Sequence, residues 1–312
     1  MEKKDIIKIF MEKGVLLSPQ ELKEIDEYNY EEILSKHIKP EEDKTIKYNK
    51  EEENKLEITT KPITKEQIEI IIKSFKKKKQ VIPKDFIDYY NKKYEGIRNI
   101  LTKKLNATSI NKAMDISSTS NIIGVVKQRA QNGFVLEDQT GSIEIVSKDD
   151  PPIGDILSVT GSSREGKFFE KEIVYPDIPL THRINSLEGE ITLEKQDGKI
   201  KVISSAVTKE TTTPSHIRIK KGDREVLVFI YEPIEPIRQD HVVELLKKRH
   251  LSPKISEILY DDDPFIIEPV PDVVVLFGGE EYVKNYKGVT VVSTGSRATK
   301  IDLETKKVEF VD

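Results

Sequence analysis

The residues that could do chemistry are few and scattered along the chain. Asp261-Asp262-Asp263 offers carboxylates of the kind that attract a hard divalent cation. Three adjacent acids before Pro264 are also typical of a solvated turn, which is the interpretation we favour. His241 and His250 are available for acid–base work, but both lie in or beside an amphipathic stretch where packing or surface roles are expected. Ser204-Ser205 has no neighbouring histidine in the sequence to act as its base.

Composition excludes several kinds of site. The 312 residues contain no cysteine, so disulfides, zinc–thiolate sites and thiol nucleophiles are excluded. The net charge is -4, so no global positive field attracts nucleic acid, and any such contact needs a local patch. No stretch approaches the roughly 18 apolar residues of a membrane span, and the first residues are charged. We therefore expect a cytoplasmic protein of two or three domains with no membrane partner.

The first part of the chain is predicted to be helical and then flexible. Residues 1–38 carry apolar side chains at helical spacing, beginning with Ile6 and Phe10, and Ser18-Pro19 is a typical helix start. Residues 39–63 are rich in charge and poor in large apolar groups, so they cannot bury enough surface to offset their chain entropy. The sequence predicts a compact helical domain followed by a flexible charged tether.

Residues 64–116 are predicted to form a helical linker region. Thr64 could cap a helix over residues 64–79, in which Ile68, Ile71, Ile72 and Phe75 would form one apolar stripe. Pro83 then breaks the chain, and residues 85–105 repeat the helical spacing of apolar groups.

Near residue 119 the hydrophobic period changes from helical to alternating, which predicts strands. Five short strands are expected, at residues 122–126, 134–138, 142–146, 156–161 and 167–175. Asn132-Gly133 is a strong hairpin turn. Five strands with hairpin spacing predict a small Greek-key barrel of OB type over residues 117–179.

Such a barrel could bind single-stranded nucleic acid through basic side chains and exposed aromatic rings. The candidate residues are Lys127, Arg129, Phe134, Arg164, Lys167 and Phe168. The alternative is that Phe134 fills the barrel core and the charges are ordinary surface. The small number of aromatic residues and the negative net charge favour this alternative.

Residues 180–312 are predicted to form a layered α/β domain built on a sheet. Two continuous apolar runs, at residues 226–230 and 273–277, are expected to be strands buried on both faces. Residues 240–249 form an amphipathic helix pattern. Residues 299–311 alternate around Thr305-Lys306, as a hairpin would.

Several short segments, in order along the chain, resemble one known family. They are Lys92-Lys93-Tyr94-Glu95-Gly96-Ile97, Leu136-Glu137-Asp138-Gln139-Thr140-Gly141, Pro176-Asp177-Ile178-Pro179, Arg249-His250-Leu251-Ser252-Pro253, Val270-Pro271-Asp272-Val273 and Tyr286-Lys287-Gly288-Val289. Together with the order of parts, they resemble the small subunit of archaeal D-family DNA polymerase, which is related to the B subunits of eukaryotic replicative polymerases. The resemblance covers most of the chain from about residue 92.

The resemblance implies a calcineurin-like phosphoesterase domain, but its catalytic ligands are missing here. Active members of the family hold two metals through an Asp-x-His motif, further ligands and a Gly-His-x-His loop. The first motif aligns with Ser205 to Val207, and the loop aligns with Gly278-Gly279-Glu280-Glu281. The degenerate positions are Ser205, Val207, Gly279 and Glu281. The interval between them is also too short for the full domain, so the resemblance implies a shortened domain without metal, cofactor or catalytic residues.

The expected protein is therefore a multidomain α+β chain with a helical N-terminal unit, an OB-type barrel and a degenerate phosphoesterase α/β sandwich. The resemblance implies a non-catalytic accessory or scaffold subunit of a replicative DNA polymerase. Its partner would be a DNA polymerase catalytic subunit or another replisome protein. The alternative is a single-stranded nucleic-acid-binding protein that acts through the barrel.

Overall fold

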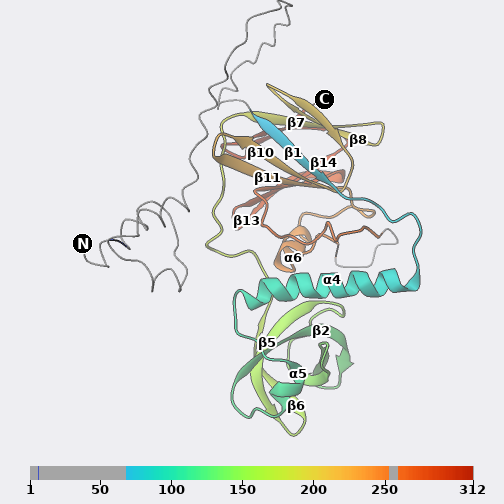
Figure 1. Ribbon diagram of the computed structural model, residues 1–312, viewed down its shortest axis with the longest axis vertical. Helices are drawn as coiled ribbons and strands as arrows, with labels where there is room; N and C mark the ends of the chain where they lie inside the picture. The colour runs from blue at the N-terminus through green and yellow to red at the C-terminus, as the bar shows by residue number, and fades with distance from the viewer. Residues whose placement is uncertain (1–5, 7–67, 253–258, 312) are drawn as a thin grey trace, which may run out of the picture. The chain divides into compact units, whose positions relative to one another are not determined.

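The computed structural model describes Ile6, residues 68–252 and residues 259–311. The chain divides into two compact units, Met1–Lys61 and Pro62–Asp312. The predicted helical domain over residues 1–38, Ile6 apart, and the predicted tether over residues 39–63 lie outside the described residues. The elements below belong to the second unit (Figure 1).

A closed five-stranded barrel forms from consecutive segments of the chain. Its strands are β2 (Ser120–Ala130), β3 (Gly133–Glu137), β4 (Ser142–Val146), β5 (Ile156–Arg164) and β6 (Lys167–Val174), which close in the order β2-β3-β4-β6-β5. β4 and β6 pair in parallel and the other pairs are antiparallel. This arrangement fits the OB fold, so the barrel prediction is confirmed.

Alternating apolar residues explain why these strands close into a barrel. One side chain in two points inward, and the interior is filled by a single cluster. Ile110 and Ala113 of the short helix α5 (Ile110–Met114) complete that cluster. Gly161 sits at an irregularity in the β5–β6 pairing, where an added Cβ would lie 2.1 Å from the carbonyl oxygen of Phe169. Only glycine allows the two backbones to approach this closely.

Helix α4 (Pro83–Thr102) precedes the barrel and confirms the helix expected after Pro83. Pro83 occupies the first turn, and the Asp85 carboxylate accepts a hydrogen bond from the backbone N–H of Ile82 at 2.9 Å. Its apolar face packs with Ile123 and Ile156 of the barrel in one cluster. Ile266 packs against the same cluster and lies close to Gly96, because a Cβ added at Gly96 would lie 2.5 Å from the Ile266 side chain.

The remaining strands form two sheets. The six-stranded sheet contains β1 (Glu69–Ser74), β10 (Ser215–Lys221), β11 (Arg224–Tyr231), β12 (Val273–Leu276), β13 (Gly278–Tyr286) and β14 (Val289–Gly295), in the order β1-β10-β11-β12-β14-β13. β12 pairs in parallel with β11 and β14, and the other pairs are antiparallel. The predicted buried strands at residues 226–230 and 273–277 are therefore confirmed as β11 and β12.

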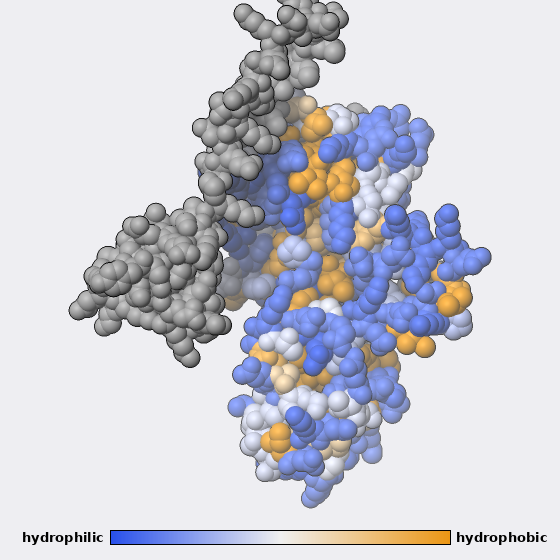
Figure 2. Space-filling model, in the orientation of Figure 1, coloured by the Kyte–Doolittle hydropathy of each residue, from blue (hydrophilic) through white to orange (hydrophobic). Residues whose placement is uncertain are grey.

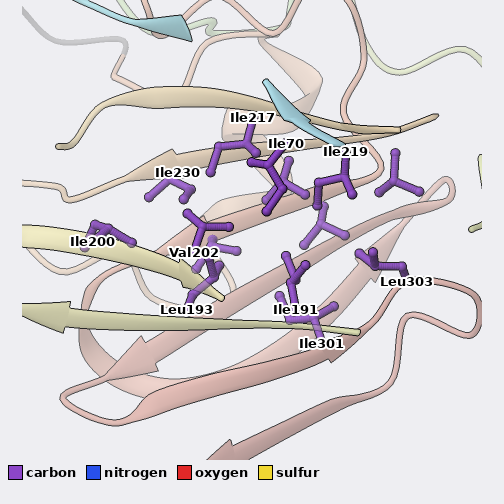
Figure 3. Packing of buried hydrophobic residues seen from close by; sticks show 14 of the residues in the cluster. Ile70, Ile191, Leu193, Ile200, Val202, Ile217, Ile219, Ile230, Ile301 and Leu303 are labelled. Atoms are coloured by element: carbon purple, nitrogen blue, oxygen red, sulfur yellow. The ribbon is translucent and has the colours of Figure 1, made fainter. Parts of the chain in front are cut away.

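The five-stranded sheet contains β7 (Glu190–Gln196), β8 (Lys199–Ser204), β9 (Thr208–Thr211), β15 (Ala298–Asp302) and β16 (Val308–Val311), in the order β16-β15-β7-β8-β9. Isoleucine, leucine and valine side chains of the two sheets face one another and form a common core, as Figure 3 shows for Ile217 and Ile230 above Ile191 and Leu193. The hairpin expected over residues 299–311 is confirmed as β15–β16.

The other face of the six-stranded sheet is covered by a second cluster. Helix α6 (Val242–Lys247) contributes Val242 and Leu246, which pack with Phe229, Val274 and other buried residues. The described part of this half is therefore two facing sheets with one short helix, a mixed and strand-rich architecture.

The helix predicted over residues 64–79 is wrong where the structure describes it. Residues 69–74 form β1, which pairs antiparallel with β10 and places Ile70 in the core between the sheets. Three consecutive β-branched residues, Ile70-Ile71-Ile72, favour a strand, and pairing with a segment far along the chain outweighs the helical spacing. In Figure 2 apolar surface gathers over β1, where Ile71 is 40% exposed.

Among the described helices, none is both long enough and apolar enough to cross a membrane.

Candidate functional site

Several of the short segments that carry the family resemblance meet where the barrel, α4 and the six-stranded sheet join. We call this region the α4 junction. Its polar residues are Lys93, Lys104, Asp155, Asp177, Lys248, Arg249, His250, Asp263, Glu268, Asp272, Tyr286 and Lys287. These residues come from parts of the chain up to nearly two hundred positions apart, and most of them are wholly or partly buried.

Asp177, at the exit from the barrel, ties three elements together. Its carboxylate accepts hydrogen bonds from the Tyr286 hydroxyl at 3.0 Å and the Lys287 ammonium at 2.5 Å. Its backbone N–H donates to the carbonyl of Lys247 at 2.7 Å. Its own carbonyl accepts from Lys104 at 2.8 Å. Asp177 therefore links the end of the barrel to α6, to the segment after α4 and to the β13–β14 turn.

Arg249 is a second connection and is only 2% exposed. Its Nε donates to the carbonyl of Ile267 at 2.7 Å, and its Nη2 contacts the Glu268 carboxylate at 2.6 Å. Glu268 also pairs with Lys103, just beyond α4, at 3.1 Å. A buried guanidinium needs such partners, because an unpaired charge inside a protein is costly.

His250 and Asp263 form a pair that is almost completely buried. His250 Nε2 lies 3.0 Å from Asp263 Oδ2, and His250 Nδ1 accepts from the N–H of Ser252 at 3.1 Å. Nδ1 therefore carries no proton, and burial holds the pKa of His250 below its usual value. With both ring nitrogens engaged, His250 has the packing role expected from the sequence. The run of three aspartates does not converge, because Asp262 instead lies 3.9 Å from Lys73.

A buried ion pair connects the barrel to α6. Lys248 Nζ lies 2.9 Å from Asp155 Oδ1, with the carboxylate side chain only 6% exposed. Burial raises the pKa of Asp155, because its charged form loses hydration, and Lys248 opposes that shift. Lys93 of α4 is also buried, which lowers its pKa, and the charges of Asp263 and Asp155 counteract that effect. The α4 junction is thus a buried network of opposite charges.

The four predicted degenerate ligand positions lie in two separate places, with Ser205 and Val207 in the connection between β8 and β9 and the other two on β13. Ser205 is exposed between β8 and β9, and the neighbouring Ser204 hydroxyl binds Val207. Gly279 and Glu281 lie on β13, and the Glu281 carboxylate is held by Arg297 at 2.7 Å. Within residues 68–252 and 259–311, no group of three or more His, Asp or Glu side chains is placed to hold a metal ion.

The six predicted nucleic-acid contacts do not form an exposed basic and aromatic surface. Phe134 and Phe168 are fully buried in the barrel core, as the alternative interpretation of Phe134 expected. Three of the four cations lie beside carboxylates: Lys127 pairs with Glu137, Arg129 with Asp150 at 2.7 Å and Lys167 with Glu144 at 2.9 Å. Arg164 is exposed at the end of β5. Phe169 is exposed instead, because successive side chains of a strand point to opposite faces and Phe168 points into the barrel.

A cavity of about 710 Å³ lies between α4 and the barrel, and no sequence motif indicated it. Tyr90, Lys93 and Tyr94 of α4 form one wall, and Val125 and Ile156 of the barrel contribute to the other. The cavity forms because two separate elements meet, so no local spacing predicts it.

No family model matches the chain. The chain is 28% identical over 107 residues to the DNA polymerase II small subunit of Archaeoglobus fulgidus, a match that covers 31% of this chain and 22% of that protein. It is 26% identical over 198 residues to the DNA polymerase II small subunit of Thermoplasma acidophilum, a match that covers 57% of this chain and 39% of that protein. The chain is thus similar to archaeal DNA polymerase II small subunits, and the similarity spans well under half of their length.

Proposed function

We propose that this protein is a non-catalytic accessory or scaffold subunit of a replicative DNA polymerase, a shortened relative of the archaeal small subunits that has lost its phosphodiesterase site. Its partner would be a DNA polymerase catalytic subunit or another replisome protein, in the cytoplasm. The similarity to two archaeal small subunits supports the proposal.

The observation that carries the proposal is the α4 junction. The segments that resemble the family supply contacts within the fold instead of an open catalytic centre. Asp272 is fully buried and accepts hydrogen bonds from the N–H of Leu227 at 2.8 Å and of Asn185 at 2.7 Å. Asp177 joins the exit of the barrel to α6 and to the β13–β14 turn, and Asp272 joins the segment at Asn185 to the six-stranded sheet. A rigid combination of modules suits a subunit that positions other proteins.

Loss of catalysis is the second part of the proposal. Hydrolysis of a phosphodiester by two metals needs ligands that hold both ions about 4 Å apart. Ser205, Val207 and Gly279 offer no carboxylate or imidazole, and Arg297 occupies the carboxylate of Glu281. We therefore infer an inactivated phosphoesterase domain that needs no cofactor.

Within the proposed subunit, the domains are the helical domain (1–38), tether (39–63), linker region (64–116), barrel (117–179) and degenerate phosphoesterase domain (180–312). β1 adds a strand from the linker region to the last of these. The barrel contributes to the scaffold. The buried Phe134 and Phe168 rings and the paired cations make single-stranded DNA the less favoured partner.

A phosphodiesterase assay tests the inactivation. Purified chain is incubated with single-stranded DNA and with a chromogenic phosphodiester, with and without Mn²⁺. We expect no turnover above the metal-only control. Glu281→Gln and the matched surface variant Glu304→Gln should behave alike. Metal-dependent hydrolysis that disappears in Glu281→Gln and persists in Glu304→Gln would refute the inactivation.

A further inference from the structure

The N-terminal end of helix α4 extends past the barrel against which the rest of the helix packs (Figure 1). We propose that this end of α4, together with the cavity between α4 and the barrel, is a docking groove for an acidic amphipathic segment of a partner protein. The chemistry of the occupant is thus apolar side chains on one face with carboxylates beside them. This inference goes beyond the proposed function and does not depend on it.

One apolar stripe runs along α4 and changes from buried to exposed. Its members follow the alternating three- and four-residue spacing of a single helix face, at Ile87, Tyr90, Tyr94, Ile97 and Leu101. The last three are buried in the cluster that joins α4 to the barrel. Ile87 and Tyr90 lie on the same face but are 60% and 47% exposed. The contact face of the helix therefore continues where the barrel no longer covers it.

The cavity beside this stripe has apolar walls. Tyr90 and Tyr94 line it from α4, and Val125, Ile153 and Ile156 line it from the barrel. Ile153 is 61% exposed, so exposed apolar side chains stand at the cavity on both the helix side and the barrel side. The volume of about 710 Å³ is several times the roughly 150 Å³ that accommodates one benzene ring. The cavity therefore has room for more than one apolar side chain.

Polar groups on the barrel side of the cavity are already engaged by the protein itself. Lys127 pairs with Glu137, and Gln139 donates to the Glu95 carboxylate at 2.7 Å. Asp138 accepts backbone hydrogen bonds from its own turn at 2.7 and 3.0 Å. A charge carried into the cavity would lose hydration without gaining a partner from these groups. The part of the occupant that enters the cavity is therefore uncharged and apolar.

The same end of α4 carries an excess of positive charge. Four exposed lysines have no ion-pair partner within residues 68–252 and 259–311, namely Lys76, Lys77, Lys79 and Lys84. Nearby acids do not balance them, because Asp85 already pairs with Lys78 and Asp262 lies beside another lysine. Asp88 and Asp261 remain against the four lysines. This charge is complementary to carboxylates on a partner.

The position of Lys84 shows that its charge does not serve the helix. It lies in the first turn of α4, where the helix dipole disfavours a cation. It also lies three residues before Ile87, so it borders the exposed part of the apolar stripe. An acidic group of the occupant could therefore meet Lys84 while its apolar neighbours cover Ile87.

Apolar groups among the lysines favour a protein segment over a nucleic-acid backbone. Val81 and Ile82, just before α4, are 38% and 56% exposed, and Figure 2 shows apolar surface among hydrophilic surface at this end of the helix. Phosphates would neutralise the lysines but would leave these side chains in water. An amphipathic segment satisfies both, as in other helix-in-groove complexes.

Binding of a synthetic peptide to the full chain tests the groove. The probe is a fluorescein-labelled peptide of about 14 residues, with leucine at the a and d positions of two heptads and glutamate at most others. We expect saturable binding by anisotropy, with a dissociation constant of about 1–100 µM. Versions with lysine in place of glutamate or serine in place of leucine, and a labelled oligothymidylate, should each bind at least about tenfold more weakly.

Variants of exposed residues locate the binding. Ile87→Ser and Lys84→Glu should each weaken the peptide affinity by at least about fivefold, because one removes an apolar contact and the other reverses a charge. The matched controls are Ile234→Ser and Lys171→Glu, at exposed positions outside α4 and the cavity, and should leave the affinity unchanged. Urea unfolding confirms that the four variants remain folded.

Tryptophan fluorescence provides a second measurement, of apolar insertion. The chain has no tryptophan, so one tryptophan in place of a leucine of an unlabelled peptide is observed without background. Its emission should shift to shorter wavelength on binding, as the ring leaves water, and the shift should shrink with Ile87→Ser. Absence of peptide binding at about 200 µM chain, affinity that both α4 variants leave unchanged, or tighter binding of the serine peptide or the oligothymidylate would overturn the proposal.

Discussion

The Tyr286 hydroxyl donates a hydrogen bond to Asp177 Oδ1 at 3.0 Å, although the two residues are 109 positions apart in the sequence. This contact joins the exit of the barrel to the β13–β14 turn. The adjacent Lys287 reinforces it with an ion pair to the other carboxylate oxygen. Two segments with no apparent chemistry of their own thus fix the barrel against the sheet.

Asp177→Ala should therefore destabilise the fold. The variant loses the contacts with Tyr286 and Lys287 and places alanine at a positive φ, which together should lower the free energy of unfolding by about 2–4 kcal/mol. Asp197→Ala is the matched control, since Asp197 also has positive φ but is exposed in the β7–β8 turn. It should cost only about 1 kcal/mol. Urea unfolding measures the free energy of unfolding of the two variants. Equal losses in Asp177→Ala and Asp197→Ala would show that the contacts of Asp177 with Tyr286 and Lys287 do not stabilise the fold.

The buried ion pair between Lys248 and Asp155 should show strong coupling. Lys248→Met leaves the Asp155 carboxylate buried without its cation, so it should lower the free energy of unfolding by about 3 kcal/mol. Adding Asp155→Asn removes the uncompensated charge and should recover part of that loss. A double-mutant cycle in urea measures the coupling. Strictly additive losses would show that the two groups do not interact in solution.

His216 should make the fold sensitive to mild acid. Its ring stacks on Phe229, and its Nε2 donates to the carbonyl of Pro264 at 3.0 Å. Burial lowers the pKa of His216 to about 4, below the 6.5 of an unfolded chain. As pH falls from 6.5 towards 4, the unfolded chain binds a proton that the folded one does not, so stability falls by about 2 kcal/mol at pH 5.

This pH dependence has two direct measurements. The change in unfolding free energy between pH 7.5 and pH 5 should be smaller in His216→Phe, which keeps the aromatic stacking but cannot titrate. The ring protons of His216, followed by NMR, should not shift until well below pH 6. A titration near pH 6.5 would contradict the buried, neutral imidazole.

The barrel should bind single-stranded DNA weakly. Each phosphate contact contributes about 0.7 to the slope of log affinity against log salt concentration for a single strand. Because three of the four candidate cations are already paired with carboxylates, we expect a slope near zero, little changed by Arg164→Glu. Fluorescence anisotropy with a labelled oligonucleotide, repeated at several salt concentrations, measures this slope. A steep slope that Arg164→Glu reduces would favour the barrel as a nucleic-acid-binding module.

Local pattern was sufficient for elements whose partners are close in sequence. The barrel strands, the β7–β8 and β15–β16 hairpins and α4 follow from alternation, turn residues and a proline at the helix start. It failed for β1, whose pairing partner, β10, lies about 140 residues further along the chain. Helical spacing and a strand-forming run coincide at residues 68–75, and only the distant partner decides between them.

The candidate site was less predictable than the fold. The segments around Asp177, Arg249, Asp272 and Tyr286 were identifiable as motifs, but nothing in their spacing indicates that they meet. Ion pairs such as Lys248 with Asp155 depend on burial that only the folded chain creates. The placement of Phe134 and Phe168 inside the barrel follows from strand alternation once the inward face is known.

Affinity purification of the tagged chain from native extract, with nuclease treatment and identification by mass spectrometry, tests the central claim most directly. An accessory subunit binds its partner through protein contacts, so we expect a DNA polymerase catalytic subunit or another replisome protein to remain bound after nucleic acid is digested. If every recovered protein disappears with the nucleic acid, the role as a polymerase accessory subunit is contradicted.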